Sequence, residues 1–154
     1  MSAHAHHPPD TSLTRTAISA TLHCLTGCAI GEVLGLALAT AFGWSDAASI
    51  AASVTLAFVF GYGLTMLPLV RSGLSLRDAV PVALGADTFS IATMELLDSA
   101  TVIAIPGAMG AGLGDPLFWA SLAGALFVAF WAAVPVNRWL IARGKGHALV
   151  HAHH

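Results

Sequence analysis

The sequence places sulfur, imidazole and carboxyl groups at helical spacing in a single run. In His23-Cys24-x-x-x-Cys28-x-x-x-Glu32, the last three named residues recur every four positions. At about 100° per residue, Cys24, Cys28 and Glu32 fall within about 80° of one another on one helix face. His23 lies at the edge of that face. Thiolate and imidazole groups suit Cu(I) or Zn(II), so this spacing predicts a site for a soft metal ion.

A second group of candidate ligands occurs about 60 residues later and consists of three acids and a thioether. On a helix, Asp87, Met94 and Asp98 share a narrow stripe, and Glu95 lies about 60° to one side. These four residues are candidate metal or proton ligands. Met66 and Met109 are possible further soft donors.

The composition indicates that both groups lie in a membrane. Hydrophobic residues make up 56% of the 154-residue chain and charged residues only 9%, whereas soluble domains carry about 25% charged residues. Six basic residues against eight acidic ones leave no electrostatic footprint for a nucleic acid. The composition excludes a disordered chain, a soluble enzyme and a nucleic-acid binder, and it predicts an integral membrane protein in contact with the lipid bilayer.

Four apolar stretches are long enough to cross a bilayer, and breaks rich in Gly, Pro or charge separate them. They cover residues 16–42, 47–70, 80–105 and 117–141. None of them alternates as a barrel strand would. The expected architecture is therefore all-α: a polytopic bundle of four transmembrane helices over residues 16–142. Residues 1–15 form a His-bearing tail and residues 143–154 a basic, His-rich tail.

The basic residues predict the orientation of the chain. With four crossings all six fall on one side of the membrane, which the positive-inside rule makes cytoplasmic. Both termini are then expected in the cytoplasm, and the protein is expected in the inner (plasma) membrane of a cell. The basic residues are Arg15, Arg71, Arg77, Arg138, Arg143 and Lys145.

The acids in the first and third stretches need a counter-charge. An ionised Asp near a bilayer centre costs on the order of 2.5 to 3.5 kcal/mol, and no Lys or Arg is expected at mid-membrane. The acids must face protein, be protonated, or hold a positive species. The two stretches run in the same direction, so neighbouring helices would bring Cys24 to the depth of Asp87 and Glu32 to the depth of Glu95.

Structural interpretations of the same residues remain open. A buried Cys is often a small apolar filler, and a protonated Glu can hydrogen-bond across helices. Gly27, Gly31 and Gly35 would allow close helix approach and turn the Cys24 face inward. Pro135 is expected to kink the last helix, with Asn137 bonding nearby. Seven tail histidines either collect divalent metals, are solvated, or are remnants of an affinity tag: His4, His6, His7, His147, His151, His153 and His154.

The motifs resemble a family of bacterial and archaeal membrane proteins. The run from His23 to Glu32 with Gly27 and Gly31, the Asp87…Met94-Glu95 segment, and the closing run Pro135-Val136-Asn137-Arg138-Trp139-Leu140-Ile141-x-Arg143-Gly144 carry the resemblance. The family is domain of unknown function 4396, and the resemblance covers about residues 15–147. It implies a four-span protein with a basic tail, and it implies no particular activity.

The residues together predict a small membrane protein that binds, and transports or delivers, a soft metal ion. Copper is favoured over zinc, with no nucleotide or organic cofactor and no favoured enzymatic activity. His23, Cys24 and Cys28 would bind the ion, Met94 would be a further donor, and the four acids would form a second polar layer. Four short helices enclose little room, so a homo-oligomer would help to line a path. The alternatives are a dithiol or quinone oxidoreductase, a proton-coupled permease and an accessory membrane subunit.

Overall fold

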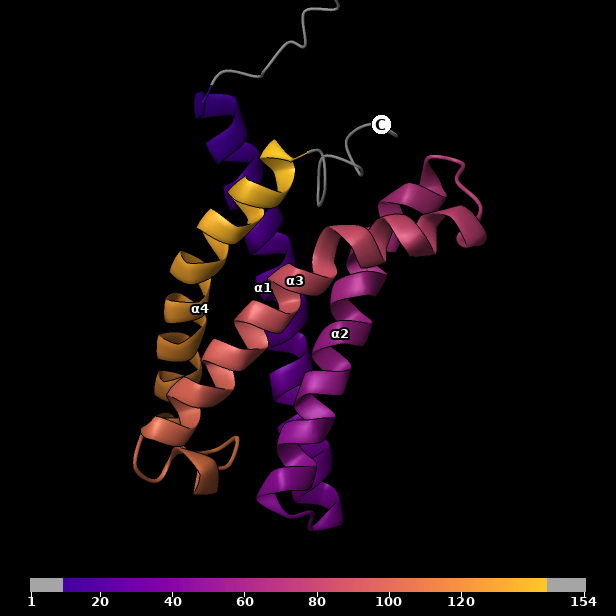
Figure 1. The fold of residues 1–154 in the computed structure, drawn as a ribbon. Helices are drawn as coiled ribbons and strands as arrows, with labels where there is room; N and C mark the ends of the chain where they lie inside the picture. Colours follow the sequence, from indigo (N-terminus) through magenta and orange to yellow (C-terminus); the bar gives the residue numbers. More distant parts are fainter. Residues whose placement is uncertain (1–9, 144–154) are drawn as a thin grey trace, which may run out of the picture.

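A computed structural model describes residues 10–143, and this part of the chain is helical apart from short links (Figure 1). Three of the long helices are each apolar and long enough to cross a membrane, and the bent α3 is a fourth if its two halves form one span. The described residues contain no strand, so the expected α-helical membrane bundle is confirmed. The elements are α1 (Asp10–Phe42), α2 (Asp46–Arg71), α3 (Leu76–Ala104), the short 3-10 helix η1 (Ala108–Gly110) and α4 (Pro116–Ala142).

Polar caps set the helix boundaries. Ser45, Ser75 and Asp115 each accept a hydrogen bond from a backbone N–H in the first turn of the helix that follows. The observed bounds lie within a few residues of the predicted stretches, except that α1 begins at Asp10 instead of residue 16. Its first turns are polar, and an apolar pattern does not detect them. The seven tail histidines lie outside the described residues.

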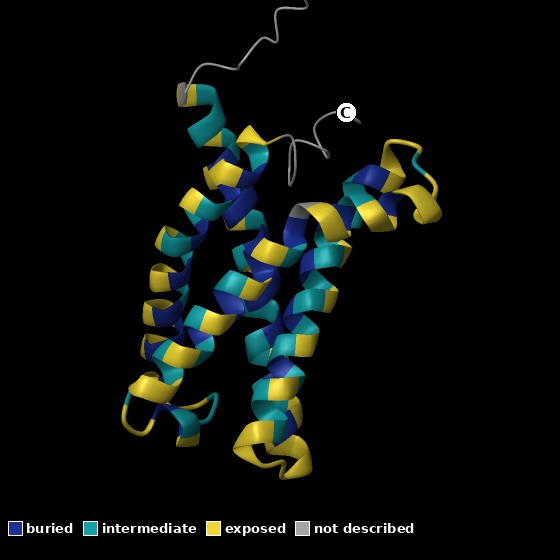
Figure 2. Cartoon of the chain, viewed as in Figure 1, coloured by how far each residue is buried: buried dark blue, intermediate teal, exposed yellow. Residues whose placement is uncertain are grey.

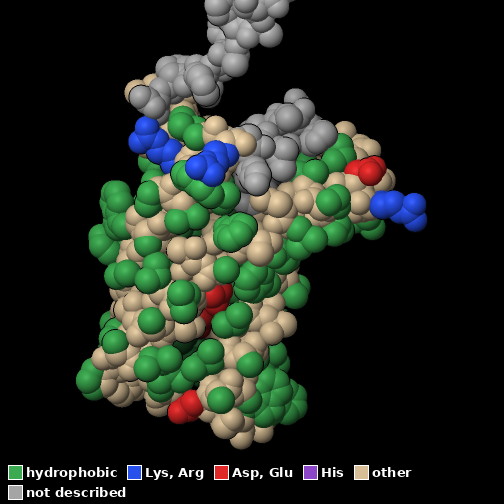
Figure 3. Space-filling model, in the orientation of Figure 1, with side chains coloured by type: hydrophobic (Ala, Val, Ile, Leu, Met, Phe, Trp, Pro, Cys, Tyr) green, Lys and Arg blue, Asp and Glu red, His purple; other side chains and the backbone are tan. Residues whose placement is uncertain are grey.

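The bundle has two distinct ends. The α1–α2 turn and the segment with η1 lie at one end, called here the η1 end (Figure 1). The opposite end contains the start of α1, the α2–α3 link and the end of α4. All five described arginines belong to helix turns at this opposite end, where Figure 3 shows the basic side chains. The five described basic residues therefore lie at one end as predicted, and the sixth, Lys145, lies outside the described residues. The outer face carries many exposed residues (Figure 2), and many of these have large apolar side chains.

Small residues hold α1 and α2 in close contact. The α1 residues Gly27, Gly31 and Gly35 face a row of small residues on α2, which consists of Gly61, Ala57 and Ser53. A Cβ added at Gly31 would lie 2.3 Å from the backbone nitrogen of Ala57. Only glycine permits such an approach, so the expectation that this face of α1 points into the bundle is confirmed.

Helix α3 bends by 49° between Leu76–Gly85 and Asp87–Ala104. The Thr88 hydroxyl donates to the Leu84 carbonyl oxygen at 2.6 Å and lies 2.9 Å from the Tyr62 hydroxyl of α2. Hydroxyl bonds back to the preceding turn are known to bend helices, and Gly85 at the bend makes the deformation easier. The bend directs the second half of α3 obliquely across the bundle (Figure 1) and puts Asp87 at the start of that half.

Candidate functional site

The first contact between candidate residues joins α1 to the start of the second half of α3. The Cys24 thiol donates to the Asp87 carboxylate at 3.6 Å, and both side chains are at most 1% exposed. The His23 side chain lies near the Asp87 carboxyl group, and the Thr65 hydroxyl of α2 lies beside the same carboxyl group. This contact agrees with the depth register predicted from the sequence, which placed Cys24 opposite Asp87.

The second contact joins two sulfur atoms at the centre of the bundle. Cys28 Sγ lies 4.0 Å from Met94 Sδ, and both side chains are buried in the same core cluster as Cys24. The carboxyl group of Glu95 lies close to the Cys28 thiol. Thiol, thioether and carboxyl groups from α1 and α3 therefore meet at one depth, within a core of buried apolar residues.

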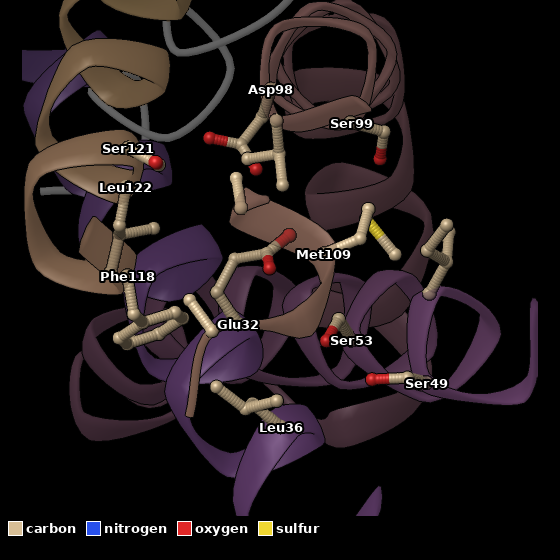
Figure 4. A pocket seen from close by; sticks show the side chains of 14 residues that line it. Glu32, Leu36, Ser49, Ser53, Asp98, Ser99, Met109, Phe118, Ser121 and Leu122 are labelled. Carbon is tan, nitrogen blue, oxygen red and sulfur yellow. The ribbon is translucent and has the colours of Figure 1, made fainter. Parts of the chain in front are cut away.

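The third contact, toward the η1 end, joins Glu32 to Asp98 (Figure 4). The predicted register paired Glu32 with Glu95, but Glu32 interacts more strongly with Asp98 and only secondarily with Glu95. The oblique course of α3 explains this difference. A tilted helix uses more residues to cover the same depth, so the sequence separation between facing residues grows from 63 at Cys24–Asp87 to 66 at Cys28–Met94.

These contacts form a polar column through an otherwise apolar bundle. We define the polar column as the eight candidate residues His23, Cys24, Cys28, Glu32, Asp87, Met94, Glu95 and Asp98. The structure brings all eight to the α1–α3 interface, but it arranges them mainly as pairs. Within residues 10–143, no group of three or more His, Cys, Asp and Glu side chains is close enough to hold a metal ion. Met94 adds a thioether donor beside Cys28.

Two acids of the polar column are buried with no hydrogen bond of ordinary geometry, although Glu95 lies beside the Cys28 thiol and Asp98 beside the Glu32 carboxyl group. Glu95 is 3% exposed and Asp98 1% exposed, and no carboxyl oxygen of either has a hydrogen-bond partner in the described part of the chain. The large majority of buried side-chain polar groups in proteins are hydrogen-bonded, and leaving one unpaired costs roughly 1–3 kcal/mol. Intramembrane acids of this kind are expensive and are usually functional.

A neutral hydrogen-bond network adjoins the polar column at the end opposite η1. The Asn137 amide of α4 donates to the Thr21 hydroxyl at 2.8 Å and to the Ser90 hydroxyl at 2.9 Å. The sequence suggested a role for Asn137 in satisfying the backbone near Pro135, but the amide links three helices instead. It thereby fixes α1 and α3 against each other one turn from Cys24.

Sequence reasoning missed four polar residues that adjoin the polar column. Thr21, Thr65, Ser90 and Ser121 are all at most 3% exposed. Ser and Thr occur throughout membrane helices and often bond to their own backbone, as Thr21 also does to Ala17, so their presence alone carries little signal. Only their spacing relative to the acids, such as Ser90 one turn after Asp87, could have indicated them.

Comparison with known proteins identifies the family but no activity. No curated protein and no solved structure matches the chain. The match to a family covers residues 14–146, which includes all four long helices except the first residues of α1. The chain therefore belongs to the family described as domain of unknown function (DUF4396).

Proposed function

We propose that the protein binds a soft metal ion, copper(I) by preference, between α1 and α3. The observation that carries this proposal is the 4.0 Å separation of Cys28 Sγ and Met94 Sδ. If one ion bound both sulfur atoms through bonds of about 2.3 Å, the sulfur–metal–sulfur angle would be about 120°. That angle suits a three-coordinate ion with one more donor. Thiolate and thioether together favour Cu(I) over hard cations.

The third donor would come from the immediate surroundings of Cys28. Cys24 lies one helical turn away in the same buried cluster, and the Glu95 carboxyl lies beside the Cys28 thiol. A bound cation would also offset the negative charge of the column, because no Lys or Arg occurs in the sequence between residues 16 and 70 or between 78 and 137. Zinc, which accepts the same donors, is the second choice.

The arrangement along the bundle axis supports transport or delivery as well as binding. Polar contacts follow one another from Cys24–Asp87 through Cys28–Met94 to Glu32–Asp98. Ionisable residues inside membrane helices commonly mark ion and proton pathways. By the positive-inside rule, the arginine-rich end would face the cytoplasm of a cell bounded by the plasma membrane, with both termini inside. A homo-oligomer would provide additional walls for such a path.

Copper binding by the purified full chain tests the proposal. The protein in detergent is loaded anaerobically with Cu(I) in competition with a Cu(I) chelator, and bound copper and zinc are measured by elemental analysis. We expect about one copper per chain in the wild type and, for Met94→Leu, at least a tenfold weaker affinity, because loss of even an outer-shell partner typically costs 10- to 100-fold. Met94→Leu preserves volume and apolarity, so it should still fold.

Matched variants separate the interior site from other donors. Met66→Leu makes the same change on α2, outside the central cluster, and should bind copper as the wild type does. Cys24→Ser/Cys28→Ser keeps every tail histidine, so any difference from the wild type reports on the interior. Equal trace copper and zinc in the wild type and in this double variant would refute metal binding. An oxidant-dependent, reversible loss of both thiols without metal binding would instead favour the dithiol oxidoreductase.

A further inference from the structure

A cavity at the η1 end of the polar column contains the Glu32 and Asp98 carboxyl groups (Figure 4). Its volume is about 60 Å³, and all four long helices and η1 contribute lining residues. A cavity needs about 10–15 Å³ to hold one water molecule, and each molecule takes about 30 Å³ in the liquid, so this cavity has room for about two waters. This cavity is therefore large enough for a partly hydrated ion.

Two buried polar groups from different helices face this cavity without a hydrogen bond. Asp98 of α3 is 1% exposed and Ser121 of α4 is 3% exposed. Neither Asp98 carboxyl oxygen, nor the Ser121 hydroxyl, has a hydrogen-bond partner among the described residues, and both residues line the cavity. Since buried polar groups are normally paired, a molecule or ion in the cavity would complete both.

The donors in the cavity select the chemistry of its ligand. Its described lining includes two carboxyl groups and no lysine, arginine or histidine, so the ligand should be positive. The lining hydroxyls are those of Ser49, Ser53, Ser99 and Ser121, and the described lining has no cysteine but includes the Met109 thioether. Carboxyl, hydroxyl and water oxygens bind hard divalent cations. Two carboxylates also balance two positive charges.

We propose that this cavity is a second cation site, which holds one partly hydrated divalent ion between Glu32 and Asp98. The ion takes carboxylate oxygens from α1 and α3, and its water molecules bond to Ser121 and the other hydroxyls. The site differs from the Cys28–Met94 pair in its ionisable donors, which are carboxyl groups and not thiols, although the Met109 thioether also lines it (Figure 4). It does not require that the sulfur pair binds copper, so either site can exist without the other.

Mn²⁺ is a suitable probe because free Mn²⁺ gives a sharp six-line electron paramagnetic resonance signal that is lost on binding. The full chain in detergent, in metal-free buffer, is titrated with Mn²⁺ alone. We expect about one site per chain in the wild type. Glu32→Gln and Asp98→Asn should each weaken it by at least about tenfold, since even the loss of an outer-shell partner has effects of this size. Asp46→Asn removes an exposed acid at the same end and should leave binding unchanged.

Two further comparisons make the result decisive. Ser121→Ala removes one buried hydroxyl, keeps both acids and should weaken Mn²⁺ binding by up to about tenfold, which tests the site even if an acid variant does not fold. Cys28→Ser and Met94→Leu should keep Mn²⁺ binding, whether or not the wild type binds copper. The second site would be overturned if the wild type did not bind Mn²⁺, or if Asp98→Asn and Ser121→Ala both bound Mn²⁺ as tightly as the wild type does. Loss of Mn²⁺ binding in Cys28→Ser alone would also overturn it.

Discussion

The contact between α1 and α2 makes a sharp prediction, because one chemical change should have opposite effects at two positions. Gly31 of α1 lies against the backbone of Ala57, and an added Cβ would be 2.3 Å from its nitrogen and 2.6 Å from its Cα. Gly63 is exposed on α2, and an added Cβ there would have nothing within 4 Å. We compare Gly31→Ala with Gly63→Ala.

The structure sets the size of the difference. Ordinary contact begins at 3.4 Å, so Gly31→Ala must move two backbones apart by at least 1.1 Å, the difference between 3.4 and 2.3 Å. Overpacking of this kind costs about 1–3 kcal/mol, and a backbone-to-backbone clash belongs at the upper end. Exchange of Gly for Ala also favours the helix by up to about 1 kcal/mol. Gly31→Ala should therefore lose about 2 kcal/mol, whereas Gly63→Ala should gain up to about 1 kcal/mol.

Unfolding of the detergent-solubilised protein by increasing fractions of SDS, followed by circular dichroism, measures both changes. The displacement of α1 should also weaken Cu(I) binding in Gly31→Ala, because Cys28 and Glu32 lie within one turn of the substitution. Shifts of the same sign and size for the two variants would refute the close α1–α2 contact. In that case α1 would not present its sulfur and acid groups to α3 as described.

Three other substitutions test the interior contacts by the same unfolding measurement. Asn137→Ala removes bonds to Thr21 and Ser90 and should lower stability by about 1 kcal/mol, because hydrogen bonds between membrane helices average about 0.6 kcal/mol; an unchanged midpoint would contradict that linkage. Tyr62→Phe removes one hydrogen bond to Thr88 beside the α3 bend and should lower stability by about half as much as Asn137→Ala does. A loss of stability as large as that of Asn137→Ala would contradict this expectation. Glu95→Gln replaces an acid that has no hydrogen bond of ordinary geometry. It should weaken copper binding without destabilising the protein, as expected where a functional group opposes stability. A destabilised variant with normal copper binding would show that Glu95 is structural.

The fold was predictable because it follows from composition and from a few local signals. Apolar length located four helices, and the breaks at Gly43 and Gly73 fall where the chain reverses with positive φ. The regular spacing of Gly27, Gly31 and Gly35 predicted a closely packed face of α1. The start of α1 at Asp10 was not predictable from this pattern, since a helix can continue beyond the apolar segment into polar surroundings.

The composition of the polar column was also predictable, but its exact pairing was not. Helical period and equal depth correctly placed Cys24 opposite Asp87. The partner of Glu32 depended on the tilt of α3, which arises from a bend at Gly85 and Thr88 that no periodic pattern encodes. The cavity was missed for a related reason, because Ser121 and the hydroxyls around it come from separate helices and acquire meaning only once the acids are placed beside them.

The order of donors along the bundle constrains what a bound cation could do. An ion entering from the η1 end would first meet the cavity with the Glu32 and Asp98 carboxyl groups, where it could keep part of its water shell, and only then the sulfur atoms of Cys28 and Met94. Passage through a channel requires binding that is weak enough to release the ion, whereas thiolate and thioether bind Cu(I) tightly because they match its softness. Soft-ion binding at this pair would therefore suit storage or transfer to an acceptor better than free conduction. Rapid copper flux through vesicles containing the protein alone would contradict this reasoning, whereas slow release that a thiol acceptor on the arginine-rich side accelerates would support it.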